Sequence, residues 1–142
     1  MQVSNMIHAT IEWNDTEKTI LILEVRADNW DWDDSFALMR DFKAKAESVE
    51  HSIYTVIIFH DTPPTPDSAV FRNVRQITKL RPKNEVLTVF VGTNSLFRTI
   101  FNTVNKIYLL KNIFDSFRFV ATKDQAIALI HEEKAKALAR NS

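Results

Sequence analysis

The chain has 142 residues with 18 basic and 18 acidic side chains, a single glycine and no cysteine. This length suits one domain, because a chain of this size buries roughly 70% of its unfolded surface. Average usage predicts about ten glycines, and a single one excludes a P-loop, a G-x-G-x-x-G dinucleotide loop and a G-x-S-x-G nucleophile elbow. The absence of cysteine excludes disulfides, thiolate metal sites and cysteine nucleophiles.

Charge is balanced overall but unevenly distributed. Residues 1–71 hold five basic and thirteen acidic side chains, whereas residues 72–118 hold nine basic and two acidic ones. The two parts could attract each other within the fold or between two copies, or the basic part could meet an acidic partner. Ordinary solvated helix faces explain the same pattern more simply.

The first ten residues contain neither a basic segment nor a long apolar stretch, so no signal peptide is expected. The apolar runs are far shorter than the ~20 residues needed to cross a bilayer. We therefore expect a cytoplasmic protein without a transmembrane segment.

Two strands joined by a hairpin are predicted first. Residues 6–13 and 19–25 are largely apolar, and polar, turn-forming residues separate them at 14–18. The nearly unbroken apolar run of residues 19–25 is typical of a strand that is buried on both faces.

A first helix is predicted next, from apolar side chains that recur at steps of three and four residues. These side chains are Trp32, Phe36, Met39, Phe42, Ala46 and Val49. Aspartates at its start suit the positive end of the helix dipole. A third strand covers residues 54–59, and a stiff loop with three prolines follows at 60–67.

The second half of the chain repeats this alternation. Asp67 or Ser68 can cap a second helix, which ends before Pro82. A fourth strand (86–91), a third helix (96–108) and a fifth strand (117–121) follow, and a capping box at 122–125 opens the last helix. We expect residues 134–142 to be a frayed tail. The order β-β-α-β-α-β-α-β-α predicts an α/β fold with a largely parallel sheet and right-handed crossovers.

This order resembles a STAS-like domain, the fold of bacterial anti-sigma-factor antagonists, which is related to the lipid-binding SEC14 fold. The resemblance extends from Met6 to about Lys134 and includes local motifs at residues 30–34, 91–94 and 119–122 that are similar to those of small uncharacterised bacterial STAS-like proteins.

The resemblance implies one domain over residues 1–142 with a five-stranded, mostly parallel sheet and an N-terminal antiparallel hairpin strand. It also implies that helices cover mainly one face, so that a helix, a terminus or a second copy must cover the other. The implied function is a non-catalytic regulatory or protein-interaction module.

Antagonists of that family carry Asp-Ser-Ser-Gly at the start of the second helix, and the second serine accepts a phosphoryl group. The matching stretch here is Asp67-Ser68-Ala69-Val70, so Ala69 holds the acceptor position and the switch is expected to be absent. A shift of one residue would make Ser68 the phosphoacceptor, although Ser68 as a plain helix cap is the simpler interpretation.

Ligands of open α/β sheets bind beyond the carboxyl ends of the strands. We therefore expect the surface that contacts another protein or a second copy at that edge. Its predicted residues are Trp30, Trp32, Asp61, Thr62, Thr65, Asp67, Ser68, Gly92, Thr93, Asn94 and Ser95. The last four are uncharged and form the best candidate for binding an anion or a small ligand, although a turn with a helix cap also explains them.

Two alternatives remain open at this stage. A carrier of a small apolar or lipid ligand could use basic residues such as Arg72, Arg75 or Arg98 for an acidic head group. A weaker alternative is a hydrolase that uses His60 and Asp61. We expect no cofactor and no metal, because the histidines are scattered, and no nucleic acid, because the phenylalanines fall on predicted core stripes.

Overall fold

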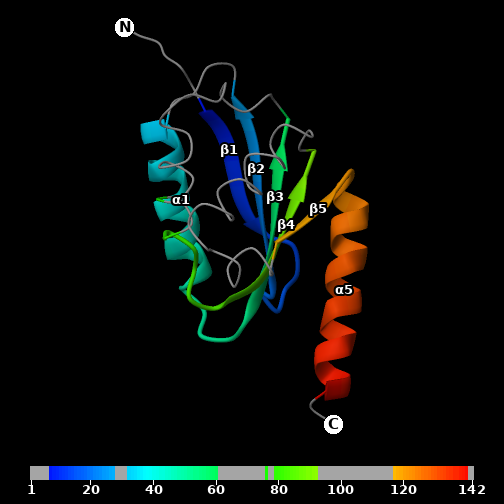
Figure 1. Ribbon diagram of the computed structural model, residues 1–142. Coiled ribbons are helices and arrows are strands. Elements are labelled where there is room, and N and C mark those ends of the chain that lie inside the picture. Colours follow the sequence, from blue (N-terminus) through cyan, green and yellow to red (C-terminus); the bar gives the residue numbers. More distant parts are fainter. Residues whose placement is uncertain (1–6, 28–31, 61–75, 77–78, 93–116, 141–142) are drawn as a thin grey trace, which may run out of the picture.

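A computed structural model describes residues 7–27, 32–60, 76, 79–92 and 117–140 (Figure 1). This part of the chain forms an α/β fold of five strands and two helices. The elements are β1 (Ile7–Trp13), β2 (Ile20–Ala27), α1 (Trp32–Ala46), β3 (Ile53–Phe59), β4 (Glu85–Val91), β5 (Phe117–Val120) and α5 (Lys123–Arg140).

The strands lie in the order β1-β2-β3-β4-β5 in a single mixed sheet. Strand β1 is antiparallel to β2, and the other neighbouring pairs are parallel. The predicted hairpin and the mostly parallel sheet are therefore confirmed. The carboxyl ends of β2 to β5 lie at one edge of the sheet, which we call the carboxyl edge, and their starts form the opposite amino edge (Figure 1).

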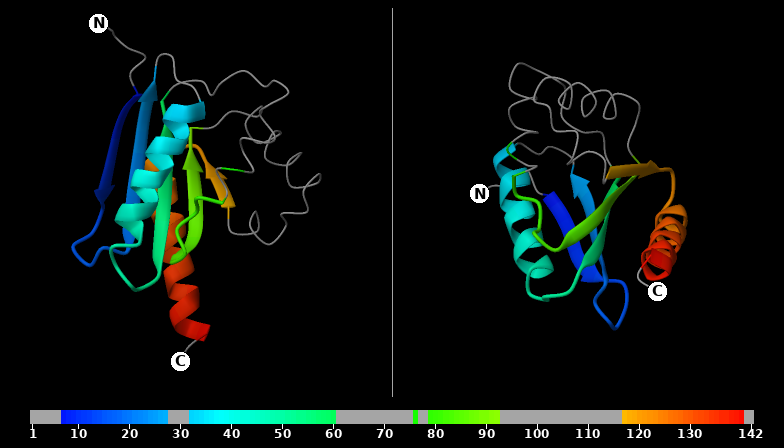
Figure 2. Two further views of the ribbon diagram at one scale, coloured as in Figure 1. Left: turned by 90° about the vertical axis from the view of Figure 1, so that its left-hand side faces the viewer. Right: turned by 60° about the horizontal axis from the view of Figure 1, so that its bottom comes forward.

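Helices α1 and α5 lie on opposite faces of the sheet, the α1 face and the α5 face (Figures 1 and 2). Alternate residues of β2 enter the two cores, with Leu21 and Leu23 on the α1 face and Ile20 and Ile22 on the α5 face. All four are buried, which confirms the prediction that this strand is covered on both sides. We expect a helix, a terminus or a second copy to cover the second face of the sheet. In the structure, helix α5 covers it.

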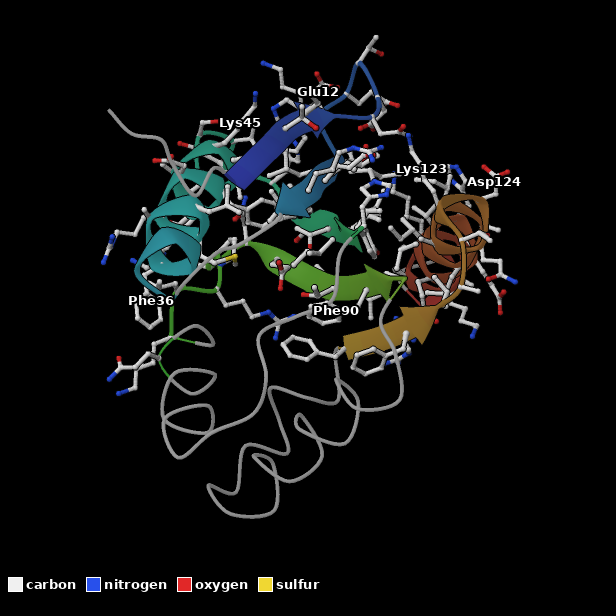
Figure 3. The ribbon with its side chains drawn as sticks, turned by 90° about the horizontal axis from the view of Figure 1, so that it is seen from above. Glu12, Phe36, Lys45, Phe90, Lys123 and Asp124 are labelled. Carbon is white, nitrogen blue, oxygen red and sulfur yellow. The ribbon has the colours of Figure 1, made fainter. Side chains whose placement is uncertain are left out.

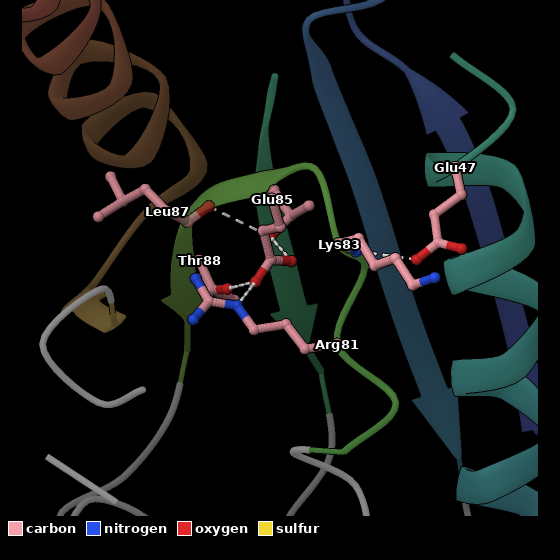
Figure 4. A network of polar contacts seen from close by, with 7 residues as sticks. Glu47, Arg81, Lys83, Glu85, Leu87 and Thr88 are labelled. Atoms are coloured by element: carbon pink, nitrogen blue, oxygen red, sulfur yellow. Dashed lines mark hydrogen bonds and ion pairs between the residues drawn. The ribbon is translucent and has the colours of Figure 1, made fainter. Parts of the chain in front are cut away.

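A β-bulge at the start of β4 brings a carboxylate into the α1 face. Ile53 pairs with Glu85 and Tyr54 pairs with Leu87, so Val86 is the extra residue and is 45% exposed. The Glu85 side chain is only 3% exposed and accepts hydrogen bonds from Thr55, at 2.7 Å, from Thr88 and from Arg81 (Figure 4). A buried charge needs partners of this kind, because an isolated one is costly.

The loops at the amino edge are joined by side-chain hydrogen bonds. The amide of Asn84 lies within hydrogen-bond distance of the carbonyl oxygens of Ala46, Val49 and His51, at 2.9, 3.1 and 3.1 Å. The ring of His51 in turn contacts the carbonyl oxygen of Lys18, at 2.8 Å. The end of α1, the start of β4 and the hairpin turn are thereby held together.

A carboxylate also links α1 to the turn before β4. Glu47 accepts hydrogen bonds from the side chain of Lys43 and from the backbone N–H of Lys83, the latter at 2.8 Å. These two bonds lower the pKa of Glu47.

Three boundaries differ from the predictions by two residues or more. Helix α1 ends at Ala46, and Val49 packs against the α1-face core from the loop that follows. Strand β2 continues to Ala27, because its last residues pair with the start of β1. Helix α5 continues to Arg140 instead of fraying from residue 134, because Lys134 contacts Thr19 across the fold. The predicted second and third helices fall largely outside the described residues.

Candidate functional site at the carboxyl edge

The structure describes two of the predicted surface residues. Trp32 is the first residue of α1, and Gly92 directly follows β4 at the carboxyl edge. The other predicted residues lie outside the part of the chain that the structure describes: Trp30, Asp61, Thr62, Thr65, Asp67, Ser68, Thr93, Asn94 and Ser95.

The single glycine of the chain occupies a special backbone position. Gly92 has φ 79°, in the left-handed region that residues with a Cβ atom avoid. Its N–H points toward the carbonyl oxygen of Val120, at 3.4 Å, across the ends of β4 and β5. The glycine therefore allows the chain to turn immediately after β4, at the edge where the sequence predicts the binding surface.

A partly exposed cluster of polar side chains, which we call the charged cluster, lies at the ends of β2 and β3. Nε2 of His60 is 2.5 Å from Oε2 of Glu24, and the guanidinium of Arg26 is 3.6 Å from the same oxygen. These side chains share the α5 face, because Glu24, Arg26 and His60 continue the same alternation as Ile22 and Ile58. His60 therefore has Glu24 as its carboxylate partner among the described residues, and Asp61 lies outside them.

Sequence reasoning missed the pairing of Glu24 with His60. The available signal was that Glu24 is the only charged residue in the apolar run at 19–25. An acid in such a run marks the point where one face of the strand leaves the core, and the parallel register then selects its neighbour on β3.

The start of α5 has the predicted capping box, which is confirmed. Thr122 Oγ1 accepts the N–H of Gln125 at 3.1 Å, and Oε1 of Gln125 accepts the N–H groups of Ala121 and Thr122 at 2.9 and 3.1 Å. These amides bind the chain's own side chains, so they do not point freely at an external anion.

A shallow surface hollow of about 530 Å³ lies where the end of β5 meets the first turns of α5. Its lining combines apolar surface with the polar groups of Gln125 and Glu132. The lining residues are Phe119, Val120, Ala121, Gln125, Ala128, Leu129 and Glu132. The sequence did not single out this hollow, because a helix face with small residues such as Ala128 carries no distinctive pattern.

Within the described ranges, no three His, Asp or Glu side chains are grouped so that they could hold a metal ion. No helix in these ranges is long and apolar enough to cross a membrane. The comparisons with protein-family models, curated proteins and solved structures found no match to this chain.

Proposed function

We propose that the chain is a cytoplasmic, non-catalytic regulatory or protein-interaction module of STAS type. It contacts another protein, or a second copy, through the carboxyl edge of its sheet. The proposal does not include a phosphoserine switch, because Ala69 stands at the acceptor position of the resembling motif.

The observation that carries the proposal is the contrast between the two edges of the sheet. At the amino edge, polar side chains such as Asn84 and His51 are used to join one loop to another. At the carboxyl edge, Arg26 is exposed and Glu24 and His60 are partly exposed, and the three form a cluster close to the end of the sheet. Exposed polar groups on a rigid support favour recognition, whereas the hydrogen bonds between loops contribute to stability.

The charged cluster is suited to binding a partner. Exposed ion pairs contribute little to folding, typically about 0–1 kcal/mol, so these side chains can exchange partners at small cost. Arg26, whose side chain is 63% exposed, can form bidentate hydrogen bonds to a carboxylate of a partner. Charges at the rim of an interface act mainly on specificity and association rate.

Site-specific photocrosslinking in the host cell tests the proposal. One form of the protein carries a benzophenone amino acid at Arg26, at the carboxyl edge, and a matched form carries it at Ser48, which is exposed at the amino edge. We expect a discrete protein adduct from position 26, identifiable by mass spectrometry, and none from position 48. An adduct from position 48 alone would place the contact surface at the amino edge and would contradict the proposal.

A carrier of a small apolar ligand is the second candidate, supported by the hollow beside β5. Phe119, Val120 and Leu129 give this hollow apolar lining that such a ligand could contact. Native mass spectrometry of protein purified gently from its host separates the candidates. A bound small-molecule mass that is lost in Ala128→Trp would support the carrier, and bare chains or protein complexes would support the interaction module.

A further inference from the structure

We propose that Lys45 prevents the open edge of β1 from pairing with the β1 strand of a second copy. Among the described residues, β2 is the only strand that pairs with β1, so the other side of β1 is a sheet edge. The unpaired N–H and C=O groups of an edge strand can form hydrogen bonds with a strand of another chain, and natural proteins often prevent this with a lysine at the edge. The inference does not depend on the proposed function.

The hydrogen-bond pattern shows which backbone groups point outward. Asn14 donates its N–H to the carbonyl oxygen of Ile20, which identifies this pair as hydrogen-bonded. In an antiparallel ladder such pairs alternate with non-hydrogen-bonded ones. The even-numbered residues of β1 therefore bond to β2, whereas Ile7, Ala9, Ile11 and Trp13 direct their N–H and C=O groups away from the sheet.

Lys45, in the last turn of α1, binds one of these outward groups. Its ammonium donates to the carbonyl oxygen of Ile11 at 3.0 Å, in an exposed position. Figure 3 shows Lys45 beside β1 and Glu12 farther along the strand. A second copy could pair with β1 in several antiparallel registers. In each register that pairs at least three of the four outward-facing residues, Ile11 is one of them. The side chain of Lys45 therefore obstructs all of these registers.

The strand is self-complementary, which favours a second copy as the occupant. Antiparallel pairing about a twofold axis gives each outward N–H a carbonyl partner on the other copy. A register centred on Ile11 places Glu12 opposite Thr10 of the second copy, so the acidic side chains do not face each other. Among the described residues, the ammonium of Lys45 is bonded to this edge, and pairing would cost it both its acceptor and part of its hydration.

Replacement of Lys45 by Met tests the proposal, because Met keeps most of the aliphatic stem and removes the charge and the donor. We expect Lys45→Met to lower the dissociation constant for self-association by about tenfold or more relative to the parent chain, measured by sedimentation equilibrium. Lys45→Arg keeps a donor and should behave like the parent chain. Lys123→Met, with the same change of charge on α5, should also leave self-association unchanged.

A second variant identifies the surface involved. The N–H of Ala9 faces outward, so Ala9→Pro removes a donor from the edge without breaking a bond to β2. The double variant Lys45→Met with Ala9→Pro should return self-association to the parent level, with circular dichroism confirming that both variants are folded. The proposal fails if Lys45→Met associates no more tightly than Lys123→Met, or if its dimer persists in the double variant. If Lys45→Met does not fold, Lys45→Ala, which also lacks both the charge and the donor, replaces it in the same comparison.

Discussion

Lys134 of α5 donates a hydrogen bond to the hydroxyl of Thr19 at 2.5 Å, although the two residues lie at opposite ends of the chain. The same ammonium lies 5.8 Å from the ring centroid of Tyr54 on β3, within the range of a cation–π contact. Burial, together with the nearby negative charge of Glu133, raises the pKa of Tyr54. The second half of α5, the hairpin turn and the start of β3 therefore meet at one point.

The hairpin turn on the other side of this contact is organised by Asp15. Its carboxylate accepts the N–H groups of Thr19 and Ile20, at 2.9 and 3.0 Å, and the hydroxyl of Thr19 at 2.5 Å. Burial acts to raise the pKa of Asp15, but these hydrogen bonds and the charge of Lys134 outweigh it, so the pKa of this carboxyl lies below its usual value.

The first prediction concerns the pH dependence of stability. Because the folded-state pKa of Asp15 is depressed, the carboxylate contributes stability that is present above its unfolded pKa and is lost as the pH falls through the folded pKa. We expect Asp15→Asn to lower the free energy of unfolding by about 1–2 kcal/mol at pH 7. The difference from the parent chain should shrink below about pH 4, as measured by urea unfolding between pH 2 and pH 7. Glu17→Gln, an exposed neighbour, should show almost no difference, and a constant Asp15→Asn deficit at all pH values would contradict the assignment.

The second prediction concerns the buried carboxylate of Glu85. Glu85→Ala removes the ionic partner of Arg81 and the carboxylate that accepts from the hydroxyls of Thr55 and Thr88, and it leaves Thr55 with only the longer contact to the carbonyl oxygen of Leu87, at 3.3 Å. Loss of one member of a buried pair costs about 3–5 kcal/mol. We expect a decrease of this size in the free energy of unfolding, measured with urea.

Val86→Ala is the matched control for Glu85→Ala. It lies next to Glu85 on the same strand but is 45% exposed, so its effect should stay within about 0.5 kcal/mol. If Glu85→Ala and Val86→Ala lower the free energy of unfolding by similar amounts, the start of β4 is sensitive to any truncated side chain, and the carboxylate of Glu85 is not the cause.

The third prediction concerns Asn84, whose amide contacts three carbonyl oxygens at the amino edge. Asn84→Ala should lower the free energy of unfolding by about 1–2 kcal/mol, because carbonyl groups that are in part buried lose their donor. Asn84→Asp should be worse than Asn84→Ala at pH 7, because a carboxylate would face those carbonyls without a proton to donate. Thermal unfolding at pH 7 tests this order, and an Asp variant as stable as the parent would refute it. Asn14→Ala, at an exposed position of the hairpin, serves as the control.

The sequence was sufficient to predict the sheet because period and composition are local signals. The burial of residues 20–23 on both faces, the turn at 14–18 and the capping box at Thr122 each depend on residues close together in the chain. The end of α1 could not be located in this way. Val49 continues the apolar stripe, yet it packs on the core from a loop, because its place is fixed by contacts with another part of the chain.

The site was harder to predict for the same reason. The contacts His60–Glu24 and Lys45–Ile11 join residues separated by more than thirty positions. They depend on strand register and on the direction of α1, neither of which leaves a motif. Gly92 is the exception, because a lone glycine at the end of a strand is itself a local signal of a backbone with positive φ.

The last prediction tests whether Gly92 is required for the geometry of the carboxyl edge. Any residue with a Cβ atom at φ 79° is strained, so Gly92→Ala should lower the free energy of unfolding by about 1–2 kcal/mol. Gly92→Asn should cost less, because asparagine tolerates the left-handed region better than alanine does. Urea unfolding of both variants measures the difference. An alanine variant as stable as the parent chain, or an asparagine variant less stable than the alanine one, would show that backbone strain does not explain the glycine. If the order is as expected, the turn after β4 needs glycine for its backbone, and the conformation at this position follows from covalent geometry rather than from any bound ligand.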